Sequence, residues 1–441
     1  MVVATRDTTI ETFVIEGGVP LSGTVRPAGN KNAALPILAA CVLTADPVTL
    51  DNVPRIRDVE AMIDLLTDIG VEVEWLGPNR VRVWAADVRK TRLDAELCSR
   101  IRASILFAGP LLARFGAADI PPPGGDVIGR RRVDTHLMAF AGLGAEVAAD
   151  REYRLAAPSG LRGADIYLDE ASVTGTENAV MAAVLAKGTT IIRNAACEPH
   201  VQDLCNLLCA MGAEIEGIGS NVLIVHGSES LHGASHRVGA DHIEVASFIG
   251  LAAVTGGEVV IEDAAVEHLR SIRHTFSRLG VEVEIEGDAV RVPARQSLRI
   301  VDDVHAQIPK VEDGPWPMFP ADLTSIAVAV ATQAAGTVLI FEKMFENRLF
   351  FVDKLISMGA EITICDPHRA VVSGPAQLYG ERLESPDIRA GMAMLIASLA
   401  ASGTTVIGNV GQIDRGYERI DERLRELGAS IERVATEPAH A

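Results

Sequence analysis

The amino-acid sequence predicts an α/β protein made of six repeated units that fold into two domains. Three features of the chain carry this prediction. A short phrase centred on glycine recurs six times, a second phrase rich in β-branched residues lies between its copies, and an apolar stretch precedes each second phrase. Each unit therefore has the order helix, strand, helix, strand, which is typical of α/β proteins.

The first phrase is expected to end a helix and begin a strand. Its five successive positions are a hydrophobic residue, a glycine, either alanine or valine, a polar residue, and a β-branched residue. Glycine adopts the left-handed conformation that commonly ends helices, and the alternating residues after it are typical of a strand. Copies 68 to 79 residues apart indicate an internal repeat. The glycines are Gly70, Gly144, Gly212, Gly280, Gly359 and Gly428.

The second phrase predicts another strand in every unit. Its clear copies place small residues before a run of Thr, Val and Ile, a composition that favours strands. These copies lie at 187–195, 256–264, 335–343 and 402–410, with a weaker copy at 46–54 and a divergent one at 115–123.

The apolar stretches predict buried helices, because they are hydrophobic on nearly every side. They span 32–43, 102–114, 176–187, 244–254, 322–335 and 389–402. Stretches with a single apolar face, such as 59–69 and 417–427, predict outer amphipathic helices.

The terminal units favour compact domains over an open solenoid. A solenoid usually ends in polar capping repeats, whereas both terminal units here have ordinary composition. Six units could form one domain or two domains of three. Two cores of roughly 210 residues fit the size limit of a single core better.

The charge balance limits the ligands that the protein can bind. Lys and Arg number 40 and Asp and Glu 59, so the formal charge is −19. A general nucleic-acid binder would carry a basic face, and anionic membranes are disfavoured for the same reason. No apolar run is long enough to span a bilayer. Six cysteines without CxxC spacing, and no export signal, lead us to expect a cytoplasmic protein.

The starts of the buried stretches are unusually polar and basic. Lys31, Arg102 and Arg389 stand at three equivalent starts, where positive charge opposes the helix dipole. We therefore expect bound anions to compensate them, provided that the starts face one crevice. Ordinary capping explains Ser172 taken alone.

Two other segments concentrate arginine. Residues 116–136 contain three prolines and three consecutive arginines, which suggests a hinged loop ending in an anion clamp; a solvated surface loop is the alternative. In 412–419, Asp414 is expected to fix the guanidinium of Arg415, and a helix start with a surface salt bridge is the alternative. Cys205 and Cys209 match no familiar zinc spacing, and there is no dinucleotide or P-loop motif, so we expect neither metal nor cofactor.

The segment 27–36, PAGNKNAALP, resembles the opening motif of the enolpyruvyl transferases. Further matches are IRASILFAGPLLARFG at 101–116, the GGxxIG and RxVDxH elements of 124–136, FENR at 345–348 and IDRGYERI at 413–420. The resemblance covers nearly the whole chain. It implies two domains of three βαβαββ units around buried parallel helices, an arrangement called an inside-out barrel. The domains would be 30–239 and 1–29 plus 240–441, with the active site in the cleft between them.

The resemblance also implies an activity. Within the family the chain is most similar to the members that use UDP-N-acetylglucosamine. These transfer the enolpyruvyl group of phosphoenolpyruvate to the 3′-hydroxyl of that sugar nucleotide, an early step of peptidoglycan synthesis, and release phosphate through a tetrahedral intermediate. A paralogue with another nucleotide or sugar acceptor, and a non-catalytic nucleotide-sugar binder, are the alternatives.

Site residues follow from the resemblance by position. Lys31, Arg102 and Arg415 would hold phosphoenolpyruvate, and Arg389 would join that anion pocket. Asn32 would hold the acceptor, and Asp322 would take the hydroxyl proton as general base. The other residues expected to contact the acceptor are Arg131, Val133, Asp134, Ser172, Val173 and Met344.

The chain departs from the family pattern at a few positions. Asp126 stands where the family usually has the loop cysteine that fosfomycin alkylates, so we expect catalysis with Asp126 and insensitivity to the drug. The remaining departures gather in the expected acceptor pocket and leave the phosphoenolpyruvate groups intact. They are Arg132, Glu170, Thr174, His242 and Ala321.

Overall fold

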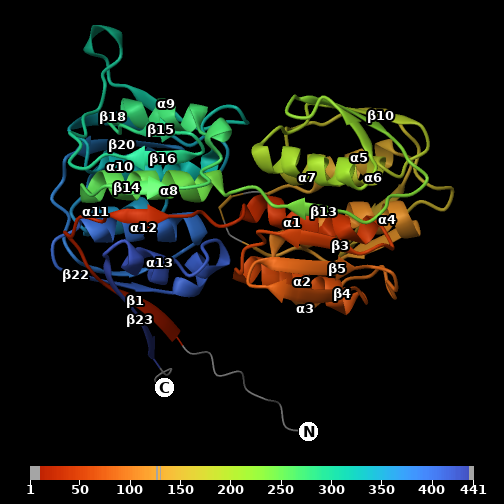
Figure 1. Ribbon diagram of the computed structural model, residues 1–441. Coiled ribbons are helices and arrows are strands. Elements are labelled where there is room, and N and C mark those ends of the chain that lie inside the picture. The colour runs from red at the N-terminus through yellow and green to blue at the C-terminus, as the bar shows by residue number, and fades with distance from the viewer. Residues whose placement is uncertain (1–9, 126–127, 130, 437–441) are drawn as a thin grey trace.

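The computed structural model describes residues 10–125, 128–129 and 131–436, whose strands form six separate sheets rather than a closed barrel (Figure 1). Figure 1 shows two bodies side by side, each with helices between its sheets. No helix in the described part of the chain is long and apolar enough to cross a lipid bilayer.

Five of the six sheets in the described part of the chain have four strands in one pattern, which the unit of β17 (Lys310–Glu312) and β18 (Gly336–Phe341) illustrates, and the sixth has three strands. The two strands are parallel and flank a buried helix, α10 (Thr324–Ala331). An outer helix and an antiparallel hairpin, β19 (Glu361–Asp366) and β20 (Arg369–Gly374), complete the unit. The fourth strand pairs with the second, so the sheet order is first, second, fourth, third.

One body contains the sheets β13-β3-β5-β4, β6-β8-β7 and β11-β12-β10-β9. Its strands are β3 (Val48–Asp51), β4 (Glu72–Gly77), β5 (Arg80–Trp84), β6 (Ala117–Ile120), β7 (Glu146–Ala149), β8 (Tyr153–Ala156), β9 (Asp165–Tyr167), β10 (Thr189–Arg193), β11 (Glu214–Glu216), β12 (Val222–His226) and β13 (Ser235–Arg237). Its helices are α1 (Lys31–Ala40), α2 (Arg57–Asp68), α3 (Ala95–Arg100), α4 (Ala108–Phe115), α5 (Asp134–Gly142), α6 (Val173–Ala183) and α7 (Pro199–Ala210), with 3₁₀ helices η1 (Cys41–Leu43) and η2 (Arg102–Phe107).

The other body contains the sheets β21-β22-β1-β23, β15-β16-β14-β2 and β17-β18-β20-β19. Its remaining strands are β1 (Ile10–Glu16), β2 (Gly23–Val25), β14 (Val259–Ile261), β15 (Glu284–Glu286), β16 (Ala289–Val292), β21 (Arg382–Glu384), β22 (Thr404–Gly408) and β23 (Ser430–Thr436). Its remaining helices are α8 (His242–Thr255), α9 (Arg270–Arg278), α11 (Val352–Ser357), α12 (Ile388–Ala400) and α13 (Ile420–Glu426), with 3₁₀ helices η3 (Val266–His268), η4 (Val304–Ala306), η5 (Ala321–Leu323) and η6 (Val410–Arg415).

The two bodies exchange their first strands. β2 precedes α1 in the chain but pairs with β14 beside α8, whereas β13 precedes α8 but pairs with β3 beside α1. The two crossing segments run side by side: the Asn30 amide donates to the Gly239 carbonyl at 2.7 Å and the Asp241 amide to the Ala28 carbonyl at 2.9 Å. A side chain at Gly29 would collide with the Asn52 carbonyl, 1.7 Å from its Cβ position.

Each body has its own buried hydrophobic core. Residues 33–238 build one, around α1, α4 and α6, and residues 13–25 with 243–431 build the other, around α8, α10 and α12. We propose that 30–239 and 1–29 plus 240–441 are the two domains, and the separate cores support this division.

The expected repeats are confirmed. All six phrase glycines have positive φ, between 81° and 105°, and the strand expected after each glycine is present. The second phrases form β3, β6, β10, β14, β18 and β22.

Several expected helix bounds were wrong, among them the end of 322–335, which stops at Ala331, and the start of 417–427, which lies at Ile420. The helix expected at 176–187 begins three residues earlier, because Ser172 caps it by accepting from the Gly175 amide at 3.2 Å. The helix expected at 102–114 starts as 3₁₀ helix and becomes α-helical only at Ala108.

Candidate active site

A cavity of about 510 Å³ lies where the six buried helices begin. Each helix contributes residues from its first turn or cap, so all six starts face one space. These residues are Lys31 and Asn32 of α1, Arg102 of η2, Ser172, Val173 and Thr174 of α6, His242 of α8, Ala321 and Asp322 of η5, and Ile388 and Arg389 of α12. The free amides of helix starts favour anions.

Asp58 links two of the cations in this cavity. Its carboxylate lies 2.8 Å from Lys31 Nζ and 2.8 Å from Arg415 Nε. Gln412 Oε1 accepts from Arg415 Nη1 at 3.0 Å. Burial raises the pKa of Asp58, but the charges of Lys31 and Arg415 outweigh it and hold that pKa below its ordinary value. The carboxylate is therefore ionised and holds both cations together.

Asp322 forms a second charged cluster in the same cavity. Its Oδ2 lies 2.9 Å from Arg389 Nη2 and its Oδ1 lies 2.9 Å from Arg348 Nη2. Asn32 Nδ2 donates to Asp322 Oδ2 at 3.3 Å. Burial raises the pKa of Asp322, yet Arg389 and Arg348 hold it well below the ordinary value. A quarter of the Asp322 side chain remains exposed, so a substrate can reach it.

Arg102 forms hydrogen bonds with the backbone of the arginine-rich loop. Its Nη2 donates to the Arg131 carbonyl at 2.6 Å and to the Arg132 carbonyl at 3.2 Å. Arg132 itself pairs with Asp134 and Asp169 at 3.1 and 3.0 Å. The loop is thus anchored to the start of η2 beside the cavity.

Two expectations about the charges need correction. The chain itself supplies partners for the cations at the helix starts: Asp58 for Lys31, Asp322 for Arg389 and loop carbonyls for Arg102. Bound anions are therefore not required to compensate them. The second correction is that Asp414 pairs with Arg433 and not with the adjacent Arg415.

Asp414 does not serve as the expected anchor of Arg415. It pairs with Arg433 at 2.8 Å and lies 3.6 Å from Arg57. Adjacent residues of the 3₁₀ helix η6 point to different sides, and Asp58, 357 positions away in sequence, holds Arg415 instead. The residue next to Arg415 in sequence is therefore not its ion-pair partner.

Two uncharged imidazoles, two buried carboxyl groups with raised pKa values and an indole form another part of the lining, which we call the neutral cluster: His200, His242, Glu177, Glu198 and Trp316. The His200 and His242 rings are stacked with centroids 6.4 Å apart, and the Trp316 ring meets His242 edge-on at 5.9 Å. Burial lowers the pKa of both imidazoles to about 3. It raises the pKa of Glu177 well above its ordinary value, and the charge of Glu198 adds to this effect.

Most residues expected in the site meet in the cavity. Lys31, Asn32, Arg102, Arg131, Ser172, Val173, Asp322, Met344, Arg389 and Arg415 line it. Val133 caps α5 and Asp134 begins it, and neither is among the described lining residues. Asp126 lies outside the described residues. All five further departures from the family pattern also line the cavity: Arg132, Glu170, Thr174, His242 and Ala321.

Sequence reasoning missed Asp58 and Arg348. Arg348 belongs to the FENR phrase, so its position was noted but its contact with Asp322 was not. Asp58 stands in the first turn of an amphipathic helix, where an acidic residue is ordinary. No sequence signal separates it from a common helix-start aspartate.

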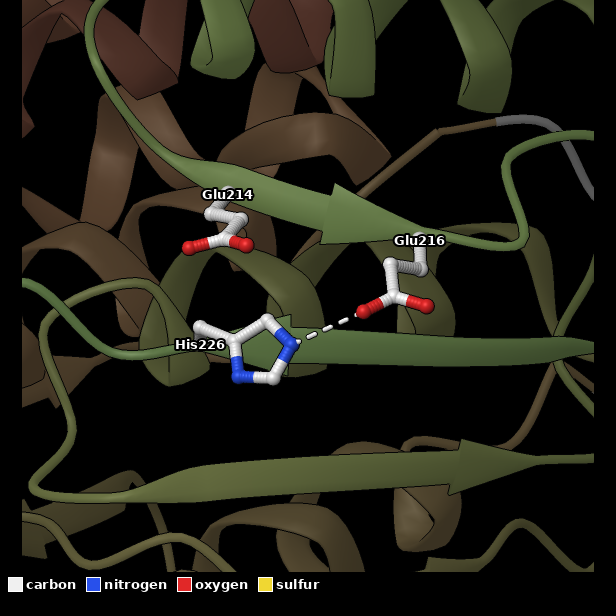
Figure 2. Close-up of side chains that lie close together, drawn as sticks. All are labelled: Glu214, Glu216 and His226. Carbon is white, nitrogen blue, oxygen red and sulfur yellow. Dashed lines mark hydrogen bonds and ion pairs between the residues drawn. The ribbon is translucent and has the colours of Figure 1, made fainter.

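One group in the described part of the chain has spacing suited to a metal ion: Glu214, Glu216 and His226, on β11 and β12 (Figure 2). Their ligand atoms lie within 4.8 Å of one another. The group lies away from the cavity lining. Glu216 Oε1 lies 3.1 Å from His226 Nε2, so a contact between side chains on neighbouring strands explains this group without a metal ion.

Known carboxyvinyltransferases are similar to this chain over nearly its whole length. The family described as EPSP synthase (3-phosphoshikimate 1-carboxyvinyltransferase) matches residues 15–424. The chain is 59% identical to the UDP-N-acetylglucosamine 1-carboxyvinyltransferase of Bradyrhizobium diazoefficiens, covering 96% of this chain and 98% of that protein. It is 54% identical to the protein of the same name from Treponema denticola, covering 95% and 98%.

Solved structures share the fold. The enolpyruvyl transferase NikO from Streptomyces tendae superposes with a TM-score of 0.86 at 25% identity, covering 97% of this chain and all of that one. An EPSP synthase from Acinetobacter baumannii gives a TM-score of 0.74 at 17% identity, covering 97% and 100%, and supports the fold alone.

Proposed function

The chain belongs to the EPSP synthase family of carboxyvinyl transferases, and from this premise we propose that it transfers the enolpyruvyl group of phosphoenolpyruvate to UDP-N-acetylglucosamine. The observation that carries the proposal is the cavity that brings together Lys31 and Arg415, both paired with the ionised Asp58, and Arg389, paired with the ionised and partly exposed Asp322. The names of the similar proteins from Bradyrhizobium and Treponema support the acceptor. The reaction would supply a precursor of peptidoglycan.

The cations suit phosphoenolpyruvate, which carries a phosphate and a carboxylate. Lys31 and Arg415 would hold these anions, partly replacing their contact with Asp58. Preorganised cations act most strongly on charge that develops during reaction, here on the leaving phosphate. No metal is needed to supply positive charge in this account.

Asp322 would take the proton of the 3′-hydroxyl as its oxygen attacks C2 of phosphoenolpyruvate. The vinyl carbon C3 gains a proton, which gives a tetrahedral adduct. Loss of phosphate and of a C3 proton then restores the double bond on the new ether. Arg389 and Arg348 make Asp322 a weak base, so a substrate anion on Arg389 would raise its basicity by offsetting that charge.

Phosphate release tests the proposal. The purified protein should release phosphate from phosphoenolpyruvate only when UDP-N-acetylglucosamine is present, and mass spectrometry should find the enolpyruvyl ether. An absence of release under these conditions would contradict the proposed function.

A second candidate is transfer to a different UDP-sugar. Five departures from the family pattern line the cavity, and Glu170 and His242 replace residues that are usually cationic. A panel of UDP-sugars distinguishes the candidates, because the true acceptor should give the highest kcat/KM for phosphate release.

A further inference from the structure

The neutral cluster differs in charge from the rest of the cavity. Seven cations line the cavity together with the ionised Asp58 and Asp322: Lys31, Arg102, Arg131, Arg132, Arg348, Arg389 and Arg415. The neutral cluster instead presents two imidazoles that burial keeps uncharged and a carboxyl group that burial drives toward its neutral acid form. An anion would gain little there, whereas an uncharged polar group fits.

The cluster also contains polar atoms without partners among the described residues. They are Glu177 Oε1, Glu198 Oε2 and His200 Nδ1. Glu177 is 1% exposed and His200 7% exposed. Buried polar groups almost always have partners in folded proteins, so three unsatisfied atoms around one cavity indicate that polar groups of a ligand or its waters complete them.

The hydrogen bonds of His242 fix which of its nitrogens is free. Asn30 caps α1, and its Oδ1 accepts from the Ala33 amide at 3.1 Å. The Asn30 amide nitrogen is therefore the atom that faces His242 Nδ1, at 3.2 Å, and it donates. An uncharged imidazole that accepts at Nδ1 carries its proton on Nε2. His242 thus offers the cavity one neutral N–H donor.

We propose that the neutral cluster binds the uncharged sugar of the acceptor, and that His242 donates its Nε2–H to an oxygen of that sugar. This inference rests on the proposed function and names the residue that selects the sugar. Hydroxyl and acetamido groups are neutral donors and acceptors, which match the unpaired atoms of the cluster. The Trp316 indole adds an apolar face beside them.

Two variants of His242 distinguish the loss of its Nε2–H donor from a general disturbance of the fold. His242→Asn keeps a polar atom near the Nδ1 position but removes the Nε2–H donor. His242→Gln places an amide N–H near the Nε2 position and should restore much of the sugar binding. His268→Gln is the control, because His268 packs against His242 at 6.0 Å but does not line the cavity.

The measurements are KM for UDP-N-acetylglucosamine, KM for phosphoenolpyruvate and the calorimetric Kd for UDP. His242→Asn should raise the KM for UDP-N-acetylglucosamine roughly tenfold or more, which is the usual consequence of leaving a buried sugar oxygen unpaired. The other two constants should change by less than about threefold, since UDP lacks the sugar. His242→Gln should recover most of the loss, and His268→Gln should leave all three constants unchanged.

Several outcomes overturn the inference. An unchanged sugar-nucleotide KM in His242→Asn removes His242 from sugar binding, and equal weakening of UDP places its effect on the nucleotide or on folding. Failure of His242→Gln to recover binding contradicts the donor role. If the unaltered protein binds UDP but releases no phosphate, the proposed function fails instead, and the two failures are distinguishable.

Discussion

Asp58 joins residues from distant parts of the chain at the edge of the candidate site. Lys31 begins α1 in one body and Arg415 ends η6 in the other, and both contact the Asp58 carboxylate. The same carboxylate borders a second cavity of about 700 Å³ between α2 and η6. A single buried aspartate therefore joins the contact between the two bodies to the charge of the site.

Replacing Arg415 by alanine should lower turnover by roughly two orders of magnitude or more, because it removes a preorganised cation from a closed anion site. Steady-state phosphate release is the measurement. Arg419→Ala is a matched control, since Arg419 follows on the same segment but is exposed and pairs with Glu422. Normal turnover of Arg415→Ala would exclude Arg415 from the anion pocket.

Replacing Asp322 by asparagine should abolish most turnover while the acceptor still binds. Asparagine keeps the shape and much of the hydrogen bonding but cannot take a proton. Calorimetric titration with UDP-N-acetylglucosamine measures binding, and single-turnover phosphate release measures chemistry. If binding is lost while bound substrate reacts at the normal rate, Asp322 positions the substrate rather than acting as base.

Asp126 should make the protein insensitive to fosfomycin. A cysteine thiol has a pKa of about 8.5 and its thiolate is a strong nucleophile, whereas a carboxylate of pKa about 3.9 is a poor one. Incubation with the drug followed by residual-activity measurement should show no inactivation of the unaltered protein and covalent inactivation of Asp126→Cys. Rapid loss of activity in the unaltered protein would contradict the role assigned to Asp126.

Helices and strands were predictable wherever a glycine or a β-branched run repeated. Gly70 and its five equivalents have positive φ because each ends an outer helix, and this requirement is local enough to show in the sequence. The capping role expected for Ser172 is confirmed, whereas the range expected for α6 began too late because it was drawn from the first apolar residues and not from this cap. The contact between Asp58 and Arg415 was not predictable, because it depends on the packing of two distant segments.

Close packing between α4 and α6 makes Gly109 intolerant of a side chain. A Cβ there would lie 2.8 Å from the Asn178 carbonyl oxygen. Gly109→Ala should therefore lower the free energy of unfolding by about 1–3 kcal/mol, the usual cost of overpacking. Urea unfolding measures it, with Gly77→Ala as the control because its nearest neighbour would be 3.9 Å away. Equal stability of the two variants would contradict this packing.

The whole molecule should lose stability when it is acidified. Burial lowers the pKa of His136, His200 and His242 to about 3, whereas a free imidazole titrates near 6.5. Between those values the unfolded chain binds more protons than the folded one. Their contribution is therefore complete above about pH 6.5 and is lost as the pH falls toward 3.

Each of these imidazoles adds a slope of about 1.4 kcal/mol per pH unit to the free energy of unfolding. Urea unfolding at several pH values from 7.5 to about 5 measures the slope. His136→Gln should reduce it by the share of one imidazole, whereas His232→Gln, at an exposed position, should leave it unchanged. An unchanged slope in His136→Gln would show that His136 is not held neutral.

The exchange of β2 and β13 has a consequence for the ancestry of the chain. Each strand completes the first unit of the body to which it does not belong in sequence. This is the arrangement that a strand-swapped homodimer of a three-unit protein would acquire if its two subunits were fused end to end. β1, which completes the last unit from the opposite end of the chain, adds a circular permutation to that fusion. The molecule thus carries the topology of a dimer within one polypeptide, and cutting it between β13 and α8 would leave residues 240–441 without β1 and β2, whereas residues 30–239 would keep β13.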